Sequence, residues 1–260
     1  MMPPAKRQGE LWGAAANDWA DHQEPFSQPL WEAMLDAGNV GAGTRFLDAG
    51  CGGGGASVLA NARGAHIWGL DAAEPLLRIA AARIPGGDFR TGDLVALPYD
   101  DGAFDVTFAS LSVMLATDPL AALRELLRVT APDGCTLVAI WGEREECEMR
   151  VVLKAIRETL PEPPQGKGPF VLSGPGHLEG LIEQAGGTVQ GGAGVECPFE
   201  YADFEALWRA QRSAGPFQGA MQVVSEARLQ DAVRRAVAPF RTPEGSIRLK
   251  NRFRYVRATP

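Results

Sequence analysis

One stretch constrains the fold of this chain more than any other: a short apolar run that ends in an acid and then in glycines. Residues 45–55 read Arg-Phe-Leu-Asp-Ala-Gly-Cys-Gly-Gly-Gly-Gly. Phe46 and Leu47 predict a buried strand that ends at Asp48, and residues 56–60 resume a helical pattern. Glycine has no Cβ, so the backbone of this loop can approach a ligand closely. The stretch therefore predicts a strand that leads through a ligand-binding loop into a helix.

Strand and helix patterns alternate along the rest of the chain. The further strands are predicted at residues 65–70, 88–91, 104–110, 135–141, 188–196 and 247–256. The helices between them are predicted at residues 75–84, 118–130, 146–160 and 178–185. Such an order is typical of an α/β fold with a doubly wound, mostly parallel sheet, here Rossmann-like with seven strands.

Two helical additions lie outside this alternation. Amphipathic patterns at residues 11–20 and 29–37 precede the first strand, and patterns at 202–212 and 218–237 interrupt the chain before the last strand. We expect one domain that spans the whole chain. Its parts are a helical N-terminal cap (1–40), a core (41–142) and a C-terminal half (143–260) with a helical insertion at about 198–242.

Composition limits the partners. The net charge is −7 and the isoelectric point is near 5.1, which argues against a nucleic-acid or anionic-membrane partner because either requires a basic face. No window reaches about 18 uninterrupted apolar residues, and the four cysteines form no CxxC pair that would predict a metal site. We expect a cytoplasmic protein with a small-molecule substrate, and its oligomeric state stays open.

The residues that end the predicted strands suggest a nucleoside pocket, because ligands of open α/β sheets lie at the carboxyl ends of the strands. Asp48 ends the first strand. Asp71 ends the second and can accept hydrogen bonds from both hydroxyls of a ribose, although an aspartate there can also cap the following helix. At the third strand end, the Asp93 carboxylate can accept from an exocyclic amine and the Leu94 amide can donate to a ring nitrogen.

A second interpretation fits the same glycines. The pattern Gly50-x-Gly52-x-x-Gly55, with Asp71 placed 21 residues after Gly50, also satisfies the fingerprint of dinucleotide-binding oxidoreductases. No Tyr-x-x-x-Lys pair exists around any of the tyrosines, which disfavours a nicotinamide-dependent enzyme. A cofactor-binding module without turnover stays a third alternative.

Taken together, the motifs resemble class I S-adenosylmethionine-dependent methyltransferases, in particular the small-molecule group that includes the ubiquinone and menaquinone biosynthetic enzymes. The resemblance covers residues 12–142. It rests on Asp48-Ala-Gly-Cys-Gly52, Gly69-Leu-Asp71, Gly92-Asp93-Leu94 with Leu97-Pro98, Phe104-Asp105-Val106, Asp118-Pro119 and the segment Leu-Arg-Val-Thr-Ala-Pro-Asp-Gly at 127–134.

The resemblance implies transfer of a methyl group from S-adenosylmethionine and a role for each matched residue. Gly50 and Gly52 would face the methionyl and ribose parts, Asp71 the ribose, and Asp93 with Leu94 the adenine. Ser110 would lie near the methionine end. The remaining cofactor-binding candidates are Asp48, Ala72 and, on an N-terminal helix that covers the cofactor, Trp19.

The sequence departs from its relatives at residues 113–116, where many carry a histidine pair and this chain reads Val-Met-Leu-Ala. His22 is then the one histidine considered as a base, against the alternative of an exposed residue at a helix end. Methyl transfer to an O or C atom can proceed mainly by positioning. The candidate substrate-binding residues are Met114, Trp141, Trp208 and Phe217, where Met114 has the alternative of plain core packing.

Overall fold

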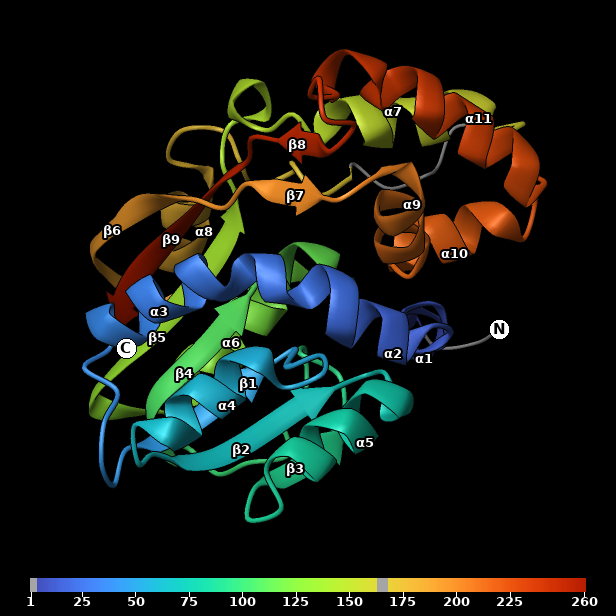
Figure 1. Cartoon of the computed structure of the whole chain (residues 1–260). Coiled ribbons are helices and arrows are strands. Elements are labelled where there is room, and N and C mark those ends of the chain that lie inside the picture. Colours follow the sequence, from blue (N-terminus) through green and yellow to red (C-terminus); the bar gives the residue numbers. More distant parts are fainter. Residues whose placement is uncertain (1–3, 163–167) are drawn as a thin grey trace.

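The computed structural model describes residues 4–162 and 168–260. Seven strands in these residues form one sheet in the order β3-β2-β1-β4-β5-β9-β6 (Figure 1). Their bounds are β1 Arg45–Ala49, β2 His66–Asp71, β3 Asp88–Thr91, β4 Phe104–Ser110, β5 Thr130–Trp141, β6 Thr188–Glu196 and β9 Arg252–Thr259. Strands β1 to β5 pair in parallel, and β9 is antiparallel to both of its neighbours. The predicted α/β fold with a doubly wound, mostly parallel seven-stranded sheet is confirmed.

Helices cover both faces of the sheet. One face carries α3 (Gln28–Ala37), α4 (Gly55–Ala62) and α5 (Glu74–Arg83), and the other carries α6 (Pro119–Val129) and α8 (His177–Ala185) (Figure 1). Neighbouring strand residues point to opposite faces, so Phe46 packs in the core under α3 and α4 while Leu47 packs in the core with α6 and α8. Burial on both faces explains why these strands read as nearly continuous apolar runs.

The N-terminal helix differs from the prediction of one helix at 11–20. The chain forms α1 (Pro4–Gly13), α2 (Ala16–Asp18), a π-helical turn (Trp19–Gln23) and a 3₁₀ turn (Glu24–Ser27) before α3. The last residue of α1, Gly13, packs closely on α5, where a Cβ would lie 2.9 Å from the ring of Pro75. Residues 4–27 are called the covering segment below.

The helical insertion lies between two short strands, β7 (Phe199–Tyr201) and β8 (Ile247–Leu249), which pair as an antiparallel ribbon. It contains α9 (Phe204–Arg212), α10 (Gly215–Met221) and α11 (Glu226–Val237), and α11 packs on α7 (Arg150–Thr159). The predicted helix at 218–237 is therefore wrong as a single element. A new helix begins after Ser225, with Glu226 in its first turn where an acid favours the helix dipole.

The predicted last strand at 247–256 is also two strands, β8 and β9. The buried side chain of Asn251 turns the chain between them, since its Oδ1 accepts from the Met149 amide (3.0 Å) and its Nδ2 donates to the Leu249 carbonyl (3.2 Å). Three basic residues of this segment form ion pairs with acids. The pairs are Arg248–Glu200, Arg252–Glu146 and Arg254–Glu179.

Short 3₁₀ turns complete the described structure at Val113–Leu115, Arg144–Glu146 and Ala238–Phe240. Among residues 4–162 and 168–260, no helix has the length and apolar character required to cross a membrane.

Candidate active site

The glycine loop leaves β1 and begins α4 in a backbone conformation that favours glycine. Gly50, Gly52 and Gly54 have φ angles of 83°, 55° and 81°, in the left-handed region. The Gly50 amide donates to the Leu70 carbonyl (2.7 Å), which holds the loop against the end of β2. The loop therefore lies where β1 and β2 end, as the sequence predicted.

Asp71 joins the end of β2 to this loop. Its Oδ2 accepts from the Gly52 amide (2.9 Å) and its Oδ1 accepts from the Ala73 amide (2.8 Å). The second contact lies just before α5, so Asp71 supports the start of that helix while it also holds the loop. A carboxylate has about four lone-pair sites, which leaves acceptor capacity for the hydroxyls of a ligand.

Asp48 is buried, with 2% of its surface exposed, directly beneath the loop. Its Oδ2 accepts from the Ser57 hydroxyl on α4 (2.7 Å). The pKa of Asp48 is raised to about 7, mainly by burial. The hydrogen bond from Ser57 lowers this pKa, and the nearby carboxylates of Glu24 and Asp71 raise it. The structure thus brings Asp48 to the helix that follows the loop, and a role toward the cofactor stays a prediction.

The end of β3 lies beside the end of β2, because the Gly92 amide donates to the Asp71 carbonyl (3.0 Å). Asp93 begins a tight turn in which its Oδ1 accepts from the Val95 amide (3.2 Å). Leu94 is half-buried and packs on the core with α6. Ala72 is covered by Gly9 of α1, whose backbone packs directly on the Ala72 carbonyl.

The end of β4 contains a residue in an unfavourable backbone conformation. Leu111 has a φ of 58°, which is uncommon for a bulky side chain and typical of functional sites. On either side, the Ser110 hydroxyl accepts from Trp31 Nε1 (3.2 Å) and the Ser112 hydroxyl donates to the Ala49 carbonyl (2.8 Å). Sequence reasoning singled out Ser110 but missed Leu111 and Ser112, and no local pattern marks a left-handed leucine.

Glu24 is a further residue that the sequence did not reveal. It comes from the covering segment, and its Oε1 accepts from the Gly53 amide (2.7 Å). Burial raises the pKa of Glu24 to about 7, although the hydrogen bond from Gly53 and the charge of Arg83 act in the opposite direction. Trp19 lies close by, with its Nε1 3.7 Å from the position of a Cβ on Gly52, and contacts Trp12 edge to face at 4.6 Å.

The predicted substrate-binding residues fall into two groups. Trp208 and Phe217 contact each other inside the insertion, with ring centroids 5.9 Å apart, and Trp208 Nε1 donates to Glu226 (3.0 Å). Met114 is buried in the 3₁₀ turn Val113–Leu115. Trp141 ends β5 and is half-buried against Phe253, with ring centroids 4.7 Å apart. The structure does not bring the two groups into contact in any aromatic pair among the described residues.

His22 lies apart from the glycine loop in the part of the chain that the structure describes. It lines a depression of about 340 Å³ on the side of the insertion, together with Phe26, Tyr201 and Arg209.

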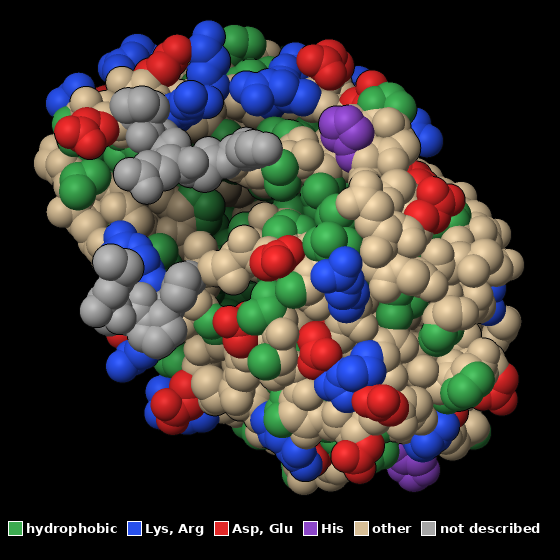
Figure 2. All heavy atoms as spheres, turned by 180° about the vertical axis from the view of Figure 1, so that it is seen from behind, with side chains coloured by type: hydrophobic (Ala, Val, Ile, Leu, Met, Phe, Trp, Pro, Cys, Tyr) green, Lys and Arg blue, Asp and Glu red, His purple; other side chains and the backbone are tan. Residues whose placement is uncertain are grey.

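Another face of the molecule is hollowed, and hydrophobic side chains gather in that hollow (Figure 2). Within residues 4–162 and 168–260, no group of three or more His, Cys, Asp or Glu side chains could hold a metal ion.

Comparison with known proteins supports the resemblance to methyltransferases. Residues 47–138 match the model of a methyltransferase domain family, and these residues contain β1, the glycine loop, Asp71 and Asp93. This part of the chain is similar to a methyltransferase domain.

The most similar relatives include a malonyl-[acyl-carrier protein] O-methyltransferase of Erwinia pyrifoliae. It is 33% identical over 150 residues, which are 58% of this chain and 57% of the relative. The chain spans about half the length of the curated relatives it matches.

Solved structures share the fold at low identity. An S-adenosylmethionine-dependent methyltransferase of Thermotoga maritima is 18% identical with a TM-score of 0.56, and the match covers 97% of this chain and 99% of that one. The [4+2]-cyclase SpnF is 21% identical with a TM-score of 0.56, over 88% of this chain and 80% of the cyclase. The same fold thus accompanies different reactions, so the function of the methyltransferase domain must be argued from its site.

Proposed function

We propose that this chain transfers a methyl group from S-adenosylmethionine to an O or C atom of a small-molecule acceptor. The hydrogen bond between Asp71 and the Gly52 amide carries the proposal, because it places an acid from β2 directly against the glycine loop of the matched domain. The proposed arrangement keeps the division of the chain into cap (1–40), core (41–142) and C-terminal half (143–260).

The residues at the carboxyl edge of the sheet suit the cofactor. The loop backbone at Gly50 and Gly52 would hold its methionyl part, and Asp71 would accept from the ribose. Asp93 and Leu94 would hold the adenine, near Ala72. Ser110 and Trp19 would border the other end, and Asp48 would support the loop through Ser57. When bound, the cofactor supplies an electrophilic methyl group on a sulfonium.

The protein's part in such a reaction is positioning. Alignment of two reactants can supply about 7–11 kcal/mol of a barrier, whereas a general base typically adds ~10²–10⁴-fold in rate. No imidazole of the described residues contacts the glycine loop, which favours an acceptor that is already a good nucleophile, such as a carboxylate or an acidic hydroxyl. The relatives named as O-methyltransferases support oxygen as the acceptor atom.

Calorimetry with S-adenosylmethionine, S-adenosylhomocysteine and nicotinamide dinucleotides tests the proposal. We expect micromolar binding of the first two and no heat from the dinucleotides. The acids at the strand ends suit an adenosine that carries no phosphate groups, whereas a dinucleotide carries two. A dinucleotide that binds while S-adenosylhomocysteine does not would favour an oxidoreductase instead. A screen of small acids with labelled cofactor then separates a methyltransferase, which labels at least one acceptor, from a binding module that labels none.

A further inference from the structure

Glu24 fills the space directly above the middle of the glycine loop. The residue is 5% exposed and lies on the covering segment, 29 residues before the loop glycine that it contacts. Its Oε1 accepts from the Gly53 amide at 2.7 Å and would lie 2.7 Å from a Cβ on Gly52. No residue larger than glycine at position 52 would leave room for this carboxylate.

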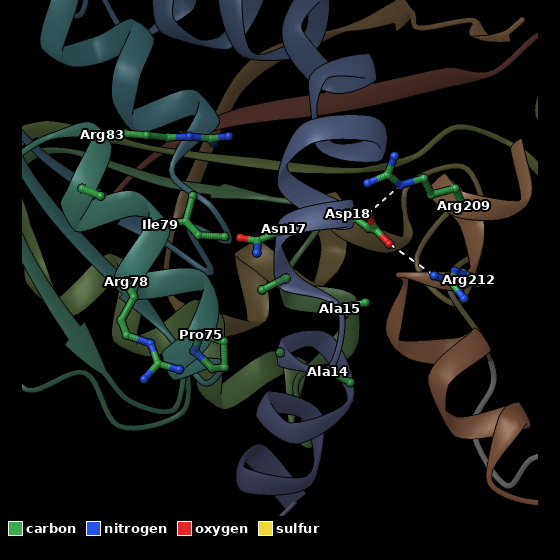
Figure 3. A pocket seen from close by; sticks show the side chains of 13 residues that line it. Ala14, Ala15, Asn17, Asp18, Pro75, Arg78, Ile79, Arg83, Arg209 and Arg212 are labelled. Carbon is green, nitrogen blue, oxygen red and sulfur yellow. Dashed lines mark hydrogen bonds and ion pairs between the residues drawn. The ribbon is translucent and has the colours of Figure 1, made fainter. Parts of the chain in front are cut away.

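Arg83 of α5 completes the contact. Its Nη1 donates to Glu24 Oε2 (3.0 Å) and to the Gly53 carbonyl (2.8 Å), and its Nη2 donates to the Ala20 carbonyl (3.2 Å). Figure 3 shows Arg83 reaching from α5 toward the covering segment. One guanidinium thus joins three parts of the molecule: α5, the loop and the segment that lies over it.

A second set of ion pairs ties the same segment to the insertion. Asp18 pairs with Arg209 (2.7 Å) and Arg212 (3.5 Å) of α9, on the other side of the segment in Figure 3. These arginine side chains are 59% and 40% exposed, and exposed pairs contribute little to stability. The Glu24–Arg83 pair is different because Glu24 is buried, so removal of Arg83 would leave a buried carboxylate without its basic partner.

We propose that Glu24 is a positioning residue for the cofactor: it fixes the Gly53 amide of the glycine loop and, through Arg83, holds the covering segment closed over the loop. The inference rests on the proposed function. Cofactor exchange then requires the hydrogen bond between Glu24 and the Gly53 amide to break. The hydrogen bond forms again when the covering segment closes over the bound cofactor.

Four charged or titratable side chains lie around Glu24 or its partner Arg83. Arg83 comes from α5, Asp71 from β2, Asp48 from β1 and Asp21 from the covering segment itself. Arg83 is the basic group that contacts Glu24, so loss of the Glu24 charge leaves this guanidinium with Asp21 at 3.6 Å and with backbone carbonyls.

The test is Glu24→Gln, which keeps the shape of the side chain and removes its charge. We expect S-adenosylhomocysteine to bind about 10-fold more weakly in calorimetry, in line with the loss of charge-assisted hydrogen bonds. The KM for S-adenosylmethionine should rise by a similar factor while kcat changes by less than about twofold, since the loss concerns binding. The matched control is Glu32→Gln, an exposed acid on α3, which should leave both constants unchanged.

Arg83→Gln and the double variant show whether the two residues act together. We expect the double variant to bind no more weakly than either single variant, because residues of one contact are not additive. Unchanged affinity in Glu24→Gln would overturn the inference, and a lower thermal midpoint in the same variant would make Glu24 a packing residue. The proposed function would still stand in that case if the wild-type protein binds S-adenosylhomocysteine. A wild-type protein that binds no S-adenosylhomocysteine would overturn both.

Discussion

Three buried or half-buried carboxyl groups surround the glycine loop: Glu24, Asp48 and Asp71. Burial is the main cause that raises each pKa, and the charges of Glu24 and Asp71 raise that of Asp48 further. Each group holds a donor of the loop or of the helix that follows it. Burial thus makes each of these groups harder to ionise than a carboxyl group in water.

Asp48→Asn should change how stability depends on pH. The pKa of Asp48 is about 7 in the folded protein, whereas its ordinary value is 3.8. The contribution of Asp48 to the free energy of unfolding is therefore fully present below pH 3.8 and is lost as pH rises through about 7. We expect the asparagine variant to show a smaller fall in the free energy of unfolding between about pH 5 and pH 8. Urea unfolding at both pH values measures this, with the exposed Asp133→Asn as control. Equal slopes in wild type and Asp48→Asn would contradict the prediction.

Asp71→Ala should weaken the binding of S-adenosylhomocysteine by roughly 2 kcal/mol or more, as expected for lost hydrogen bonds to a charged acceptor. The variant also frees the Gly52 and Ala73 amides that Asp71 now holds. Calorimetry measures the affinity, and circular dichroism checks that the sheet is retained. The exposed Asp100→Ala serves as control, and a wild-type dissociation constant in Asp71→Ala would show that the acid does not bind the ligand.

At the scale of elements, a buried polar network joins the covering segment to the insertion. Tyr201 of β7 donates to Gln23 Oε1 (2.8 Å), and Gln211 of α9 donates to both Gln23 Oε1 (3.0 Å) and the Tyr201 hydroxyl (2.7 Å). The π-helical turn presents Gln23 to this network. π-helical turns are rare in proteins, and those that occur often lie at functional sites. Because the network joins the covering segment to the insertion, we expect the two to move as one unit.

Tyr201→Phe should therefore lower the free energy of unfolding by about 1–3 kcal/mol, because two buried glutamine side chains lose a partner. Urea unfolding measures the loss, and Tyr255→Phe on β9 is the matched control. We also expect faster hydrogen exchange at residues 19–23 in the Tyr201 variant. Unchanged exchange there would show that the network does not hold the covering segment.

At the scale of the whole molecule, the covering segment contacts several elements along one edge of the sheet. Gly9 packs on Ala72, Gly13 on Pro75 and Glu24 on Gly53, while α1 also packs on α10 of the insertion. The segment before the first strand thus contacts the insertion that precedes the last strand. If this cover closes over a bound cofactor, it would exclude water and would have to open for exchange.

Removal of residues 1–27 should leave a folded sheet that binds S-adenosylhomocysteine weakly and does not turn over. The deletion removes Trp19 and Glu24 but keeps α3 and both cores of the sheet. Calorimetry and a methyl-transfer assay with an accepted acid measure the two effects. Turnover at the full-length rate would show that the segment contributes packing alone.

The sequence by itself determined the elements whose signal is local. The apolar run at Phe46 and Leu47, the glycines after Asp48 and the acids that end β2 and β3 are all read within a few residues, because strand periodicity and glycine conformation are properties of short segments. The methyltransferase motifs and the prediction of a doubly wound, mostly parallel sheet followed from these. Element bounds failed where a distant contact intervened, as at Gly13 against Pro75 and at Asn251 against Met149.

Only the tertiary structure decided which residues meet across the chain. Glu24 reaches Gly53, Tyr201 reaches Gln23, and Trp208 packs on Phe217 inside the insertion. The left-handed conformation of Leu111 likewise depends on how β4 meets the loop. Each depends on how the covering segment and the insertion fold onto the sheet, and contacts between segments far apart in sequence leave no periodic pattern in either of them.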